Sequence, residues 1–400
     1  MMNDTIYSEL FVQSERLKNE VKNLPKRRFL YEDLTKKTNV MCGVYGLRGT
    51  GKTTLLLQIA NNKENSLYIN AENLAFVGSS IKEAVEFAVK KGMEYFFIDE
   101  VHAIPEWPME LKLLYDSGIK NIYFSGSSTI KIQEKAADLS RRAVLFHLPP
   151  LSFREFVDLY LDKKIDKVLF DDLLDFNTRK KIIAALAPYE RYFEEYMKFG
   201  SFPFYFSQKD DAYQMYKNII EKMVRFDLAS VAKIDANYIE SIYKVLGLFA
   251  LTGPNEISKN FISKTIKRNA YTVDTILKGL CDVGMLNPVM PFKKGASVLR
   301  KEPKYLLSPP LRLTLGLSYG ATYEQIVGGI REDIFILNTL NFNPRYIKTD
   351  RESKTPDYII NGISFELGAH RFKHETDYYV KDKLIIDEKI IPLPLFCLFY

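Results

Sequence analysis

The chain has 400 residues, of which 46% are hydrophobic and 26% are charged, and its formal net charge is +6 at pH 7. This length predicts about two to four domains, each with its own core. No apolar run approaches the roughly 18 residues that a membrane span needs, which excludes a membrane-spanning class. The net charge is small for the length, so it permits a nucleic-acid partner without indicating one.

The N-terminal segment and the cysteines indicate the compartment. Residues 1–20 are polar and lack the apolar centre of a secretory signal. Cys42, Cys281 and Cys397 are far apart, lie in apolar stretches and show no metal-ligand spacing. We therefore expect buried thiols and a cytoplasmic protein.

Residues 46–53 read Gly-Leu-Arg-Gly-Thr-Gly-Lys-Thr and fill every fixed position of the phosphate-binding pattern G-x-x-x-x-G-K-[ST]. The apolar run 40–45 predicts a buried parallel strand before this loop, and 54–60 predicts a helix after it. The glycines let successive N–H groups point at phosphates, Lys52 would reach the β- and γ-phosphates, and the Thr53 hydroxyl would hold Mg²⁺. The predicted nucleoside triphosphate site comprises Gly46, Arg48, Gly49, Thr50, Gly51, Lys52, Thr53 and Thr54.

A second strand supplies carboxylates. Residues 95–98 form an unbroken apolar run, typical of a parallel strand covered on both faces, and the run ends in Asp99-Glu100. Asp99 is expected to hold the Mg²⁺ shell and Glu100 to polarise an attacking water. An acidic strand end that only caps the following turn is the alternative, which the phosphate loop upstream disfavours.

Two further strand-like runs, 66–70 and 121–124, complete a βαβ series. The second is followed by Ser125-Gly126-Ser127-Ser128. Ser125 or Ser127 suits a sensor that hydrogen-bonds the γ-phosphate or the attacking water. Ordinary turn chemistry explains the same residues equally well.

Two arginines, Arg141 and Arg142, precede another apolar run at 143–148. An arginine aimed at the γ-phosphate, from this chain or from a neighbouring subunit, would stabilise charge in the transition state. A solvated basic turn is the alternative reading of this pair.

These residues carry a family resemblance. The run 97–107, the turn 125–128, residues 139–142 with 150–156, and the turn 199–204 together resemble a family of prokaryotic AAA-type ATPases of mostly unassigned role. The resemblance spans nearly the whole chain. It implies ATP and Mg²⁺ as ligands and an α/β P-loop NTPase core.

The resemblance also implies site residues. The nucleotide site of the family corresponds to Lys52, Thr53, Asp99 and Glu100. Arg142 matches the family's arginine more closely than Arg141 does. Because the family often has a glycine where Arg141 stands, the choice between the two arginines is open.

Beyond the core, residues 151–237 predict amphipathic helices of a lid or connector. The aromatic residues that crowd 189–206 are expected to pack in a core, although a surface that stacks bases is conceivable.

Residues 238–310 have the order of a winged helix. Helices are expected at 238–251, 258–266 and 273–283, and a two-stranded wing within 286–306. The cations suit DNA phosphates, whereas winged helices also serve in protein contact or packing. These cations are Lys259, Lys264, Lys267, Arg268, Lys278, Lys293, Lys294 and Arg300.

Residues 311–400 resemble a small α+β restriction-endonuclease-like domain. A helix is expected to open at 329, and Asn361-Gly362 between two apolar runs predicts a hairpin. In such folds an aspartate and a glutamate hold Mg²⁺, which corresponds to Asp357 and Glu366, with Glu332 as the helix glutamate. The family's lysine is replaced by Gly368, unless Arg371 or Lys373 substitutes, so an inactive structural or interaction domain is favoured.

The sequence therefore predicts a cytoplasmic AAA-type ATPase with an ATPase core (1–150), a helical lid (151–237), a winged helix (238–310) and an endonuclease-like domain (311–400). A nucleotide-dependent binding switch with little turnover and an ATP-powered nuclease are the alternatives. DNA, a protein partner and an oligomer are all compatible with the sequence.

Overall fold

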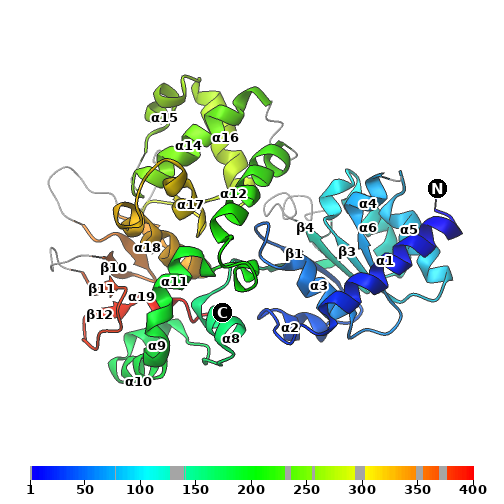
Figure 1. The fold of residues 1–400 in the computed structure, drawn as a ribbon, viewed down its shortest axis with the longest axis horizontal. Coiled ribbons are helices and arrows are strands. Elements are labelled where there is room, and N and C mark those ends of the chain that lie inside the picture. The colour runs from blue at the N-terminus through cyan, green and yellow to red at the C-terminus, as the bar shows by residue number, and fades with distance from the viewer. Residues whose placement is uncertain are drawn as a thin grey trace. The chain divides into compact units, whose positions relative to one another are not determined.

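The computed structural model of the chain describes residues 2–76, 78–126, 139, 141–229, 236–254, 257–292, 302–347, 355–368 and 376–400. The chain divides into two compact units, Met1–Pro149 and Pro150–Tyr400 (Figure 1). Each unit contains a five-stranded sheet of its own. Across the described ranges, no helix has the length and apolar character that crossing a bilayer requires.

The first unit is built on a parallel sheet with the strand order β2-β3-β4-β1-β5. Because all its strands run in the same direction, the segments that follow them meet at one edge of the sheet. The strands are β1 (Met41–Tyr45), β2 (Ser66–Asn70), β3 (Tyr95–Asp99), β4 (Ile122–Gly126) and β5 (Ala143–His147).

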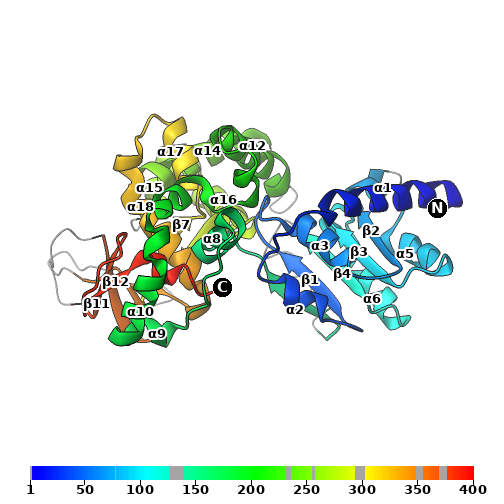
Figure 2. The ribbon, with the colours of Figure 1, turned by 60° about the horizontal axis from the view of Figure 1, so that its bottom comes forward.

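Helices cover both faces of this sheet (Figure 2). Side chains of successive strand residues point to opposite faces, so Phe96 and Ile98 enter one hydrophobic cluster and Phe97 enters the other. This two-sided burial explains why the strands are continuous apolar runs. The helices are α1 (Asp4–Lys22), α2 (Tyr31–Thr35), α3 (Lys52–Ala60), α4 (Ala71–Phe76), α5 (Ile81–Lys90), the 3-10 turn η1 (Val101–Ala103) and α6 (Trp107–Asp116).

The second unit begins with short helices that pack through aromatic rings. Phe193, Tyr196 and Phe202 are each at most 2% exposed, so the aromatic-rich stretch 189–206 forms a core. The helices are α8 (Phe153–Leu161), α9 (Phe170–Leu174), α10 (Phe176–Leu186), η3 (Ala187–Tyr192), α11 (Phe193–Glu195), η4 (Tyr196–Gly200), η5 (Pro203–Phe206), α12 (Ala212–Lys222) and η6 (Met223–Asp227).

A trihelical segment with a two-stranded antiparallel sheet follows. After η7 (Ala236–Tyr238) it comprises α14 (Ile239–Leu251), α15 (Lys259–Ile266), α16 (Ala270–Asp282), β6 (Leu286–Val289) and β7 (Lys304–Leu307). The third helix begins at Ala270, three residues before the expected start, because the Asn269 side chain caps it by accepting the Thr272 N–H at 2.9 Å. Lys293, Lys294 and Arg300, expected in the wing, lie outside the described residues.

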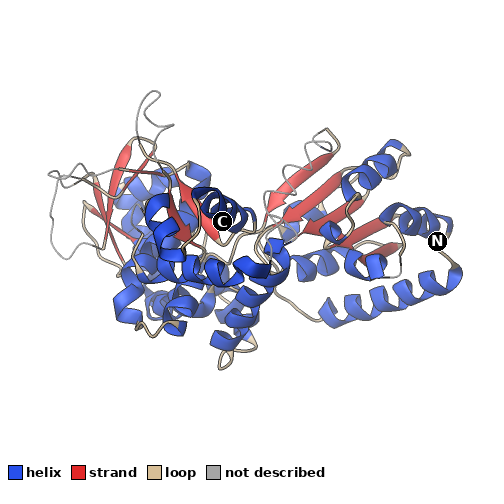
Figure 3. Cartoon of the chain, turned by 90° about the horizontal axis from the view of Figure 1, so that it is seen from above, coloured by secondary structure: helices blue, strands red, loops and turns tan. Residues whose placement is uncertain are grey.

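The chain ends in a mixed sheet with the order β12-β11-β10-β9-β8. Figure 3 shows the strands of the chain in red. Asn361 and Gly362 have φ angles of 52° and 84° and form the expected hairpin between β9 and β10. The elements are α17 (Leu311–Ser318), α18 (Tyr323–Thr339), η9 (Leu340–Phe342), β8 (Arg345–Tyr346), β9 (Tyr358–Ile360), β10 (Ile363–Leu367), β11 (Tyr378–Lys381), β12 (Ile390–Pro392) and α19 (Leu393–Phe396).

One helix of this region starts earlier than the sequence indicates. α18 begins at Tyr323 and not at Gly329, because Thr322 and Gln325 form a capping box at its N-terminus. Its Asp333 is 1% exposed and accepts the Arg312 Nη2 hydrogen bond at 3.0 Å, which ties α18 to α17. Both partners of this ion pair are 1% exposed, so removing either one would leave the other charge buried without its partner.

Candidate nucleotide-binding site

The loop between β1 and α3 is shaped by its glycines. Gly51 adopts a left-handed conformation, with φ of 92°, as the N-cap of α3. A Cβ atom on Gly46 would lie 2.1 Å from the Leu148 carbonyl oxygen, so no larger residue fits there. The loop therefore turns tightly, with the N-terminus of α3 facing its interior, and forms a cradle for an anion.

The Lys52 ammonium is held over this cradle. Its side chain is 5% exposed, and Nζ donates to the carbonyl oxygens of Gly46 at 3.0 Å and Leu47 at 3.1 Å. The Thr50 hydroxyl donates to the same Leu47 oxygen at 2.9 Å and stiffens the turn. A buried cation fixed beside backbone N–H groups favours a phosphate ligand.

Asp99 lies at the end of β3 and collects hydroxyl groups from three elements. Its Oδ2 accepts from Thr53 Oγ1 at 2.6 Å and from Tyr68 OH at 2.8 Å, and its Oδ1 accepts from Ser125 Oγ. The carboxylate is 1% exposed, so these donors replace the water that it loses. Thr53 and Asp99, the two residues expected at Mg²⁺, thus lie in direct contact.

Glu100, the expected water-polarising residue, occupies an unusual backbone conformation. Its φ of 53° is left-handed, and its N–H lies 3.4 Å from Ser125 Oγ. The buried Oε2 atom accepts no hydrogen bond from the described residues, although His102 Nδ1 lies 3.3 Å away. A buried carboxylate oxygen without a donor is costly, and such groups concentrate at functional sites.

Of the two expected sensor serines, Ser125 is the one that lies within the described residues. Ser125 is fully buried, and its hydroxyl is engaged with Asp99. It therefore braces the acidic strand end in this structure. Ser127 lies outside the described residues.

Arg141 and Arg142 are not near the loop of their own chain. β1 and β5 pair in parallel with Met41 opposite Ala143, so residues before β5 lie at the sheet edge opposite the loop, about 13 Å away along the strand. Arg142 Nε donates to Asp116 Oδ1 at 2.8 Å there. A contact of either arginine with a γ-phosphate stays a prediction, and this position favours a contact made across subunits.

Three residues around the loop were missed by the sequence analysis. Tyr68 lies within the apolar run of β2, and its hydroxyl, which donates to Asp99, is the one feature of the residue that could have indicated a polar role. Arg28 is 6% exposed and donates to the Thr50 carbonyl and, through Nη2 at 2.8 Å, to the Pro149 carbonyl. His147 stacks on Tyr45, and burial, aided by Arg28 and Lys52, lowers its pKa to about 4, so it is neutral.

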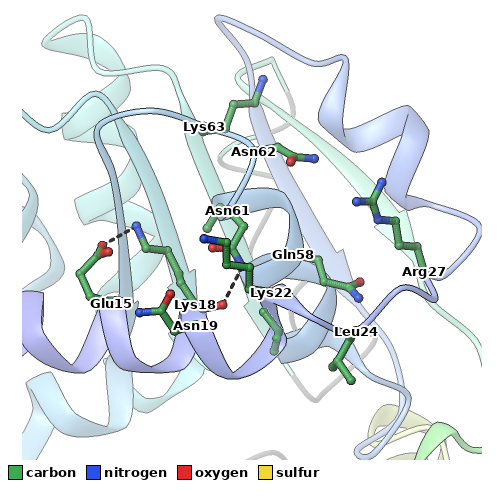
Figure 4. Close-up of a pocket in the computed structure, with 12 residues that line it drawn as sticks. Glu15, Lys18, Asn19, Lys22, Leu24, Arg27, Gln58, Asn61, Asn62 and Lys63 are labelled. Carbon is green, nitrogen blue, oxygen red and sulfur yellow. Dashed lines mark hydrogen bonds and ion pairs between the residues drawn. The ribbon is translucent and has the colours of Figure 1, made fainter.

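A polar pocket lies at the other end of α3 (Figure 4). Its volume is about 340 Å³, and it is lined by α1, the segment that follows α1, the end of α3 and the residues after α3. α3 has nine residues, so this end is about 13 Å from the loop. Gln58 and Asn61 already donate to the carbonyls of Lys26 and Lys18. The pocket is therefore separate from the phosphate cradle.

Two of the three carboxylates expected at a second metal site, those of Glu332 and Asp357, accept hydrogen bonds within the chain. Glu332 Oε2 accepts from Lys304 Nζ and from Tyr358 OH, both at 2.6 Å. Burial, reinforced by Glu332, raises the pKa of Asp357 to about 7. In the described ranges no three histidine, cysteine, aspartate or glutamate side chains are grouped to hold a metal.

The position of the missing lysine is filled from α18. A Cβ atom on Gly368 would lie 3.7 Å from Arg331 Cδ and Nη1, and Arg331 Nε pairs with Asp382 at 2.5 Å. An arginine engaged in this way is a poor substitute for a free lysine. The alternative substitutes, Arg371 and Lys373, lie outside the described residues.

Two separate stretches of the chain match known protein families. Residues 38–157 match the family described as AAA domain, and residues 190–309 match a domain of unknown function, DUF8612. An uncharacterized protein of Methanocaldococcus jannaschii is 27% identical over 344 residues, which cover 78% of this chain and 72% of that protein. A second uncharacterized protein of this archaeon is 30% identical over 168 residues, or 40% and 35% of the two chains.

The solved structure of AMPPCP-bound DnaA from Aquifex aeolicus is 16% identical and covers 66% of this chain and 86% of its own, with a TM-score of 0.24. A likeness this distant carries no argument about function. The parallel sheet, the loop after β1 and the match over residues 38–157 agree with one another. Residues 38–157 are therefore similar in sequence to an AAA domain, and most of them lie in the unit built on the parallel sheet.

Proposed function

We propose that the first unit binds ATP with Mg²⁺ at the loop 46–53 and hydrolyses it. The contact of 2.6 Å between Thr53 Oγ1 and Asp99 Oδ2 carries this proposal. It brings the hydroxyl of the phosphate loop and the carboxylate of β3 together at the same edge of the sheet, which is the arrangement that holds Mg²⁺ beside phosphates.

The residues of the site divide the chemistry among them. Mg²⁺, when bound with ATP, would neutralise negative charge on the β- and γ-phosphates. Lys52 adds a positive charge from the loop, and the N–H groups at the N-terminus of α3 donate to the phosphate oxygens. Glu100 orients the attacking water, because its buried Oε2 atom can accept a water hydrogen.

Hydrolysis would drive or switch the second unit. Because Arg141 and Arg142 lie away from their own loop, a γ-phosphate contact by either requires a neighbouring subunit, so that full activity would depend on assembly. The rival form of the proposal is a binding switch that holds ATP and turns it over negligibly.

Single-turnover hydrolysis of radiolabelled ATP tests the proposal. We expect Lys52→Ala to abolish binding, and Glu100→Gln to bind ATP but lower turnover by about 100-fold or more. Lys91→Ala is the matched control, because this exposed lysine pairs with Asp4 on the surface. Turnover that survives both substitutions would refute hydrolysis at this site, and tight binding without turnover in the unaltered chain would establish the rival switch.

A second candidate function is nucleic-acid contact by the trihelical segment. The order of three helices and an antiparallel pair of strands supports a winged helix. Lys264, Lys267 and Lys278 are exposed, and Tyr271 at the start of α16 is 81% exposed. Exposed cations and an exposed aromatic ring suit a phosphate backbone and its bases, although Asp274 pairs with Lys259 in the same segment.

For the terminal sheet we propose a structural or interaction role. Of its expected metal residues, Glu332 accepts a hydrogen bond from Lys304, and burial raises the pKa of Asp357. Arg331 lies beside Gly368. We expect no Mg²⁺-dependent cutting of DNA or RNA by the full chain. Cutting that disappears in Asp357→Ala would overturn this role and establish the ATP-powered nuclease.

A further inference from the structure

Arg28 connects the phosphate loop with the segment through which the chain leaves the first unit. It lies between α1 and α2 in sequence, yet its guanidinium donates to the carbonyl oxygens of Thr50, in the loop, and of Pro149, at the end of the unit. The side chain is 6% exposed. The planar fork of an arginine can hold two such acceptors at once.

The bond to Thr50 sets the direction of one peptide group in the loop. The peptide between Thr50 and Gly51 is planar and trans, so its C=O and N–H point in opposite directions. With the carbonyl fixed on Arg28, the Gly51 N–H points away from Arg28. The left-handed φ of 92° at Gly51 accommodates this orientation, which only glycine adopts at little cost.

The bond to Pro149 secures a dipeptide, Pro149-Pro150, that has no backbone N–H of its own. Pro149 and Pro150 have no N–H groups, so the backbone of this dipeptide can accept hydrogen bonds through its carbonyl oxygens but cannot donate any. Immediately before it, the Leu148 N–H donates to Tyr45 at 2.8 Å, and the Leu148 carbonyl lies against Gly46. The exit segment 148–149 thus contacts the start of the loop directly and is linked to Thr50 through Arg28.

We propose that Arg28 is a positioning residue that transmits the state of the phosphate loop to the exit segment 148–149, and through it to the second unit. This inference rests on the proposed ATP binding. When the loop N–H groups engage phosphates, the Thr50–Gly51 peptide is polarised and its carbonyl binds Arg28 more strongly. The same guanidinium holds Pro149, so the exit segment is held more firmly in the nucleotide-bound unit.

Hydrogen exchange at the Leu148 N–H tests this link in the full chain. A non-hydrolysable ATP analogue with Mg²⁺, at about 100 times its Kd, is expected to slow this exchange by about 10- to 100-fold in the unaltered protein. Arg28→Lys retains the charge but loses the fork, so we expect it to bind the analogue without this slowing. Arg27→Lys is the control, because Arg27 is exposed and stacks on Tyr31 instead.

Each other outcome has a distinct meaning. Slowing that persists in Arg28→Lys overturns the link, as does analogue binding to the unaltered chain without any slowing. Loss of analogue binding in folded Arg28→Lys makes Arg28 part of the phosphate site and also overturns it. If circular dichroism shows that this variant does not fold, the exchange of the Leu148 N–H in the unaltered chain, with and without the analogue, still tests the link. Failure of the unaltered chain to bind the analogue refutes the proposed function itself.

Discussion

Asp357→Asn is expected to stabilise the second unit at neutral pH. Burial, with Glu332 next in importance, raises the pKa of Asp357 from 3.8 to about 7. The folded unit therefore keeps this proton over a range of pH in which the unfolded chain has lost it. Stability from this group is complete below about pH 4 and is lost as the pH rises to about 7.

The size of this effect follows from the shift. A change of about three pKa units corresponds to up to about 4 kcal/mol of unfolding free energy. Asparagine is neutral at every pH, and its amide oxygen can still accept the Leu367 N–H, which lies 2.8 Å from Asp357 Oδ2. We expect the variant to match the unaltered protein at pH 4 and to exceed its stability at pH 8 by up to about 4 kcal/mol.

Urea unfolding followed by far-UV circular dichroism measures this difference. The chain has a single tryptophan, Trp107, which is buried in the first unit, so its fluorescence reports separately on that unit and should not change. Asp377→Asn is the control beside the same sheet. Hydrogen bonds from Ser364 lower the pKa of Asp377, so its charged form stabilises the folded unit and the substitution should lower stability at pH 8. Equal or lower stability of Asp357→Asn at pH 8 would refute the reasoning.

Three further substitutions test other parts of the structure. Gly46→Ala places a methyl group 2.1 Å from the Leu148 oxygen, so we expect ATP affinity to fall by at least about 10-fold in titrations, whereas unchanged affinity would contradict the loop geometry. Arg312→Met leaves Asp333 buried without its cation and should lower the unfolding free energy of the second unit by about 3–5 kcal/mol in urea, and a neutral result would contradict the pairing. If the trihelical segment binds DNA, Lys264→Ala should reduce the slope of log K against log salt by about 1, with exposed Lys217→Ala as the control.

The sequence predicted those features that depend on local pattern. The strand, loop and helix around Gly46 follow from residue order alone, as does the hairpin at Asn361 and Gly362, whose positive φ angles only certain residues tolerate. The start of α18 was missed because Thr322 and Gln325 act as a cap, a signal present in the sequence but overlooked.

Long-range contacts could not be predicted in the same way. Arg28 meets Pro149 across 121 positions, and the basic run 26–28 reads only as an exposed turn. The place of Arg142 could have been anticipated, since it precedes a strand parallel to β1, whereas the loop follows β1. The hydrogen bond from Tyr68 to Asp99 exists because β2 pairs with β3 in the sheet, and the order of strands in a sheet cannot be read from the local sequence.

ATP turnover by the unaltered chain and by Glu100→Gln, measured side by side under single-turnover conditions, tests the central claim most directly. The account predicts that both bind ATP with Mg²⁺ and that the substitution lowers the rate of hydrolysis by about 100-fold or more. Equal rates in the two proteins, or hydrolysis by Lys52→Ala at the unaltered rate, would contradict it.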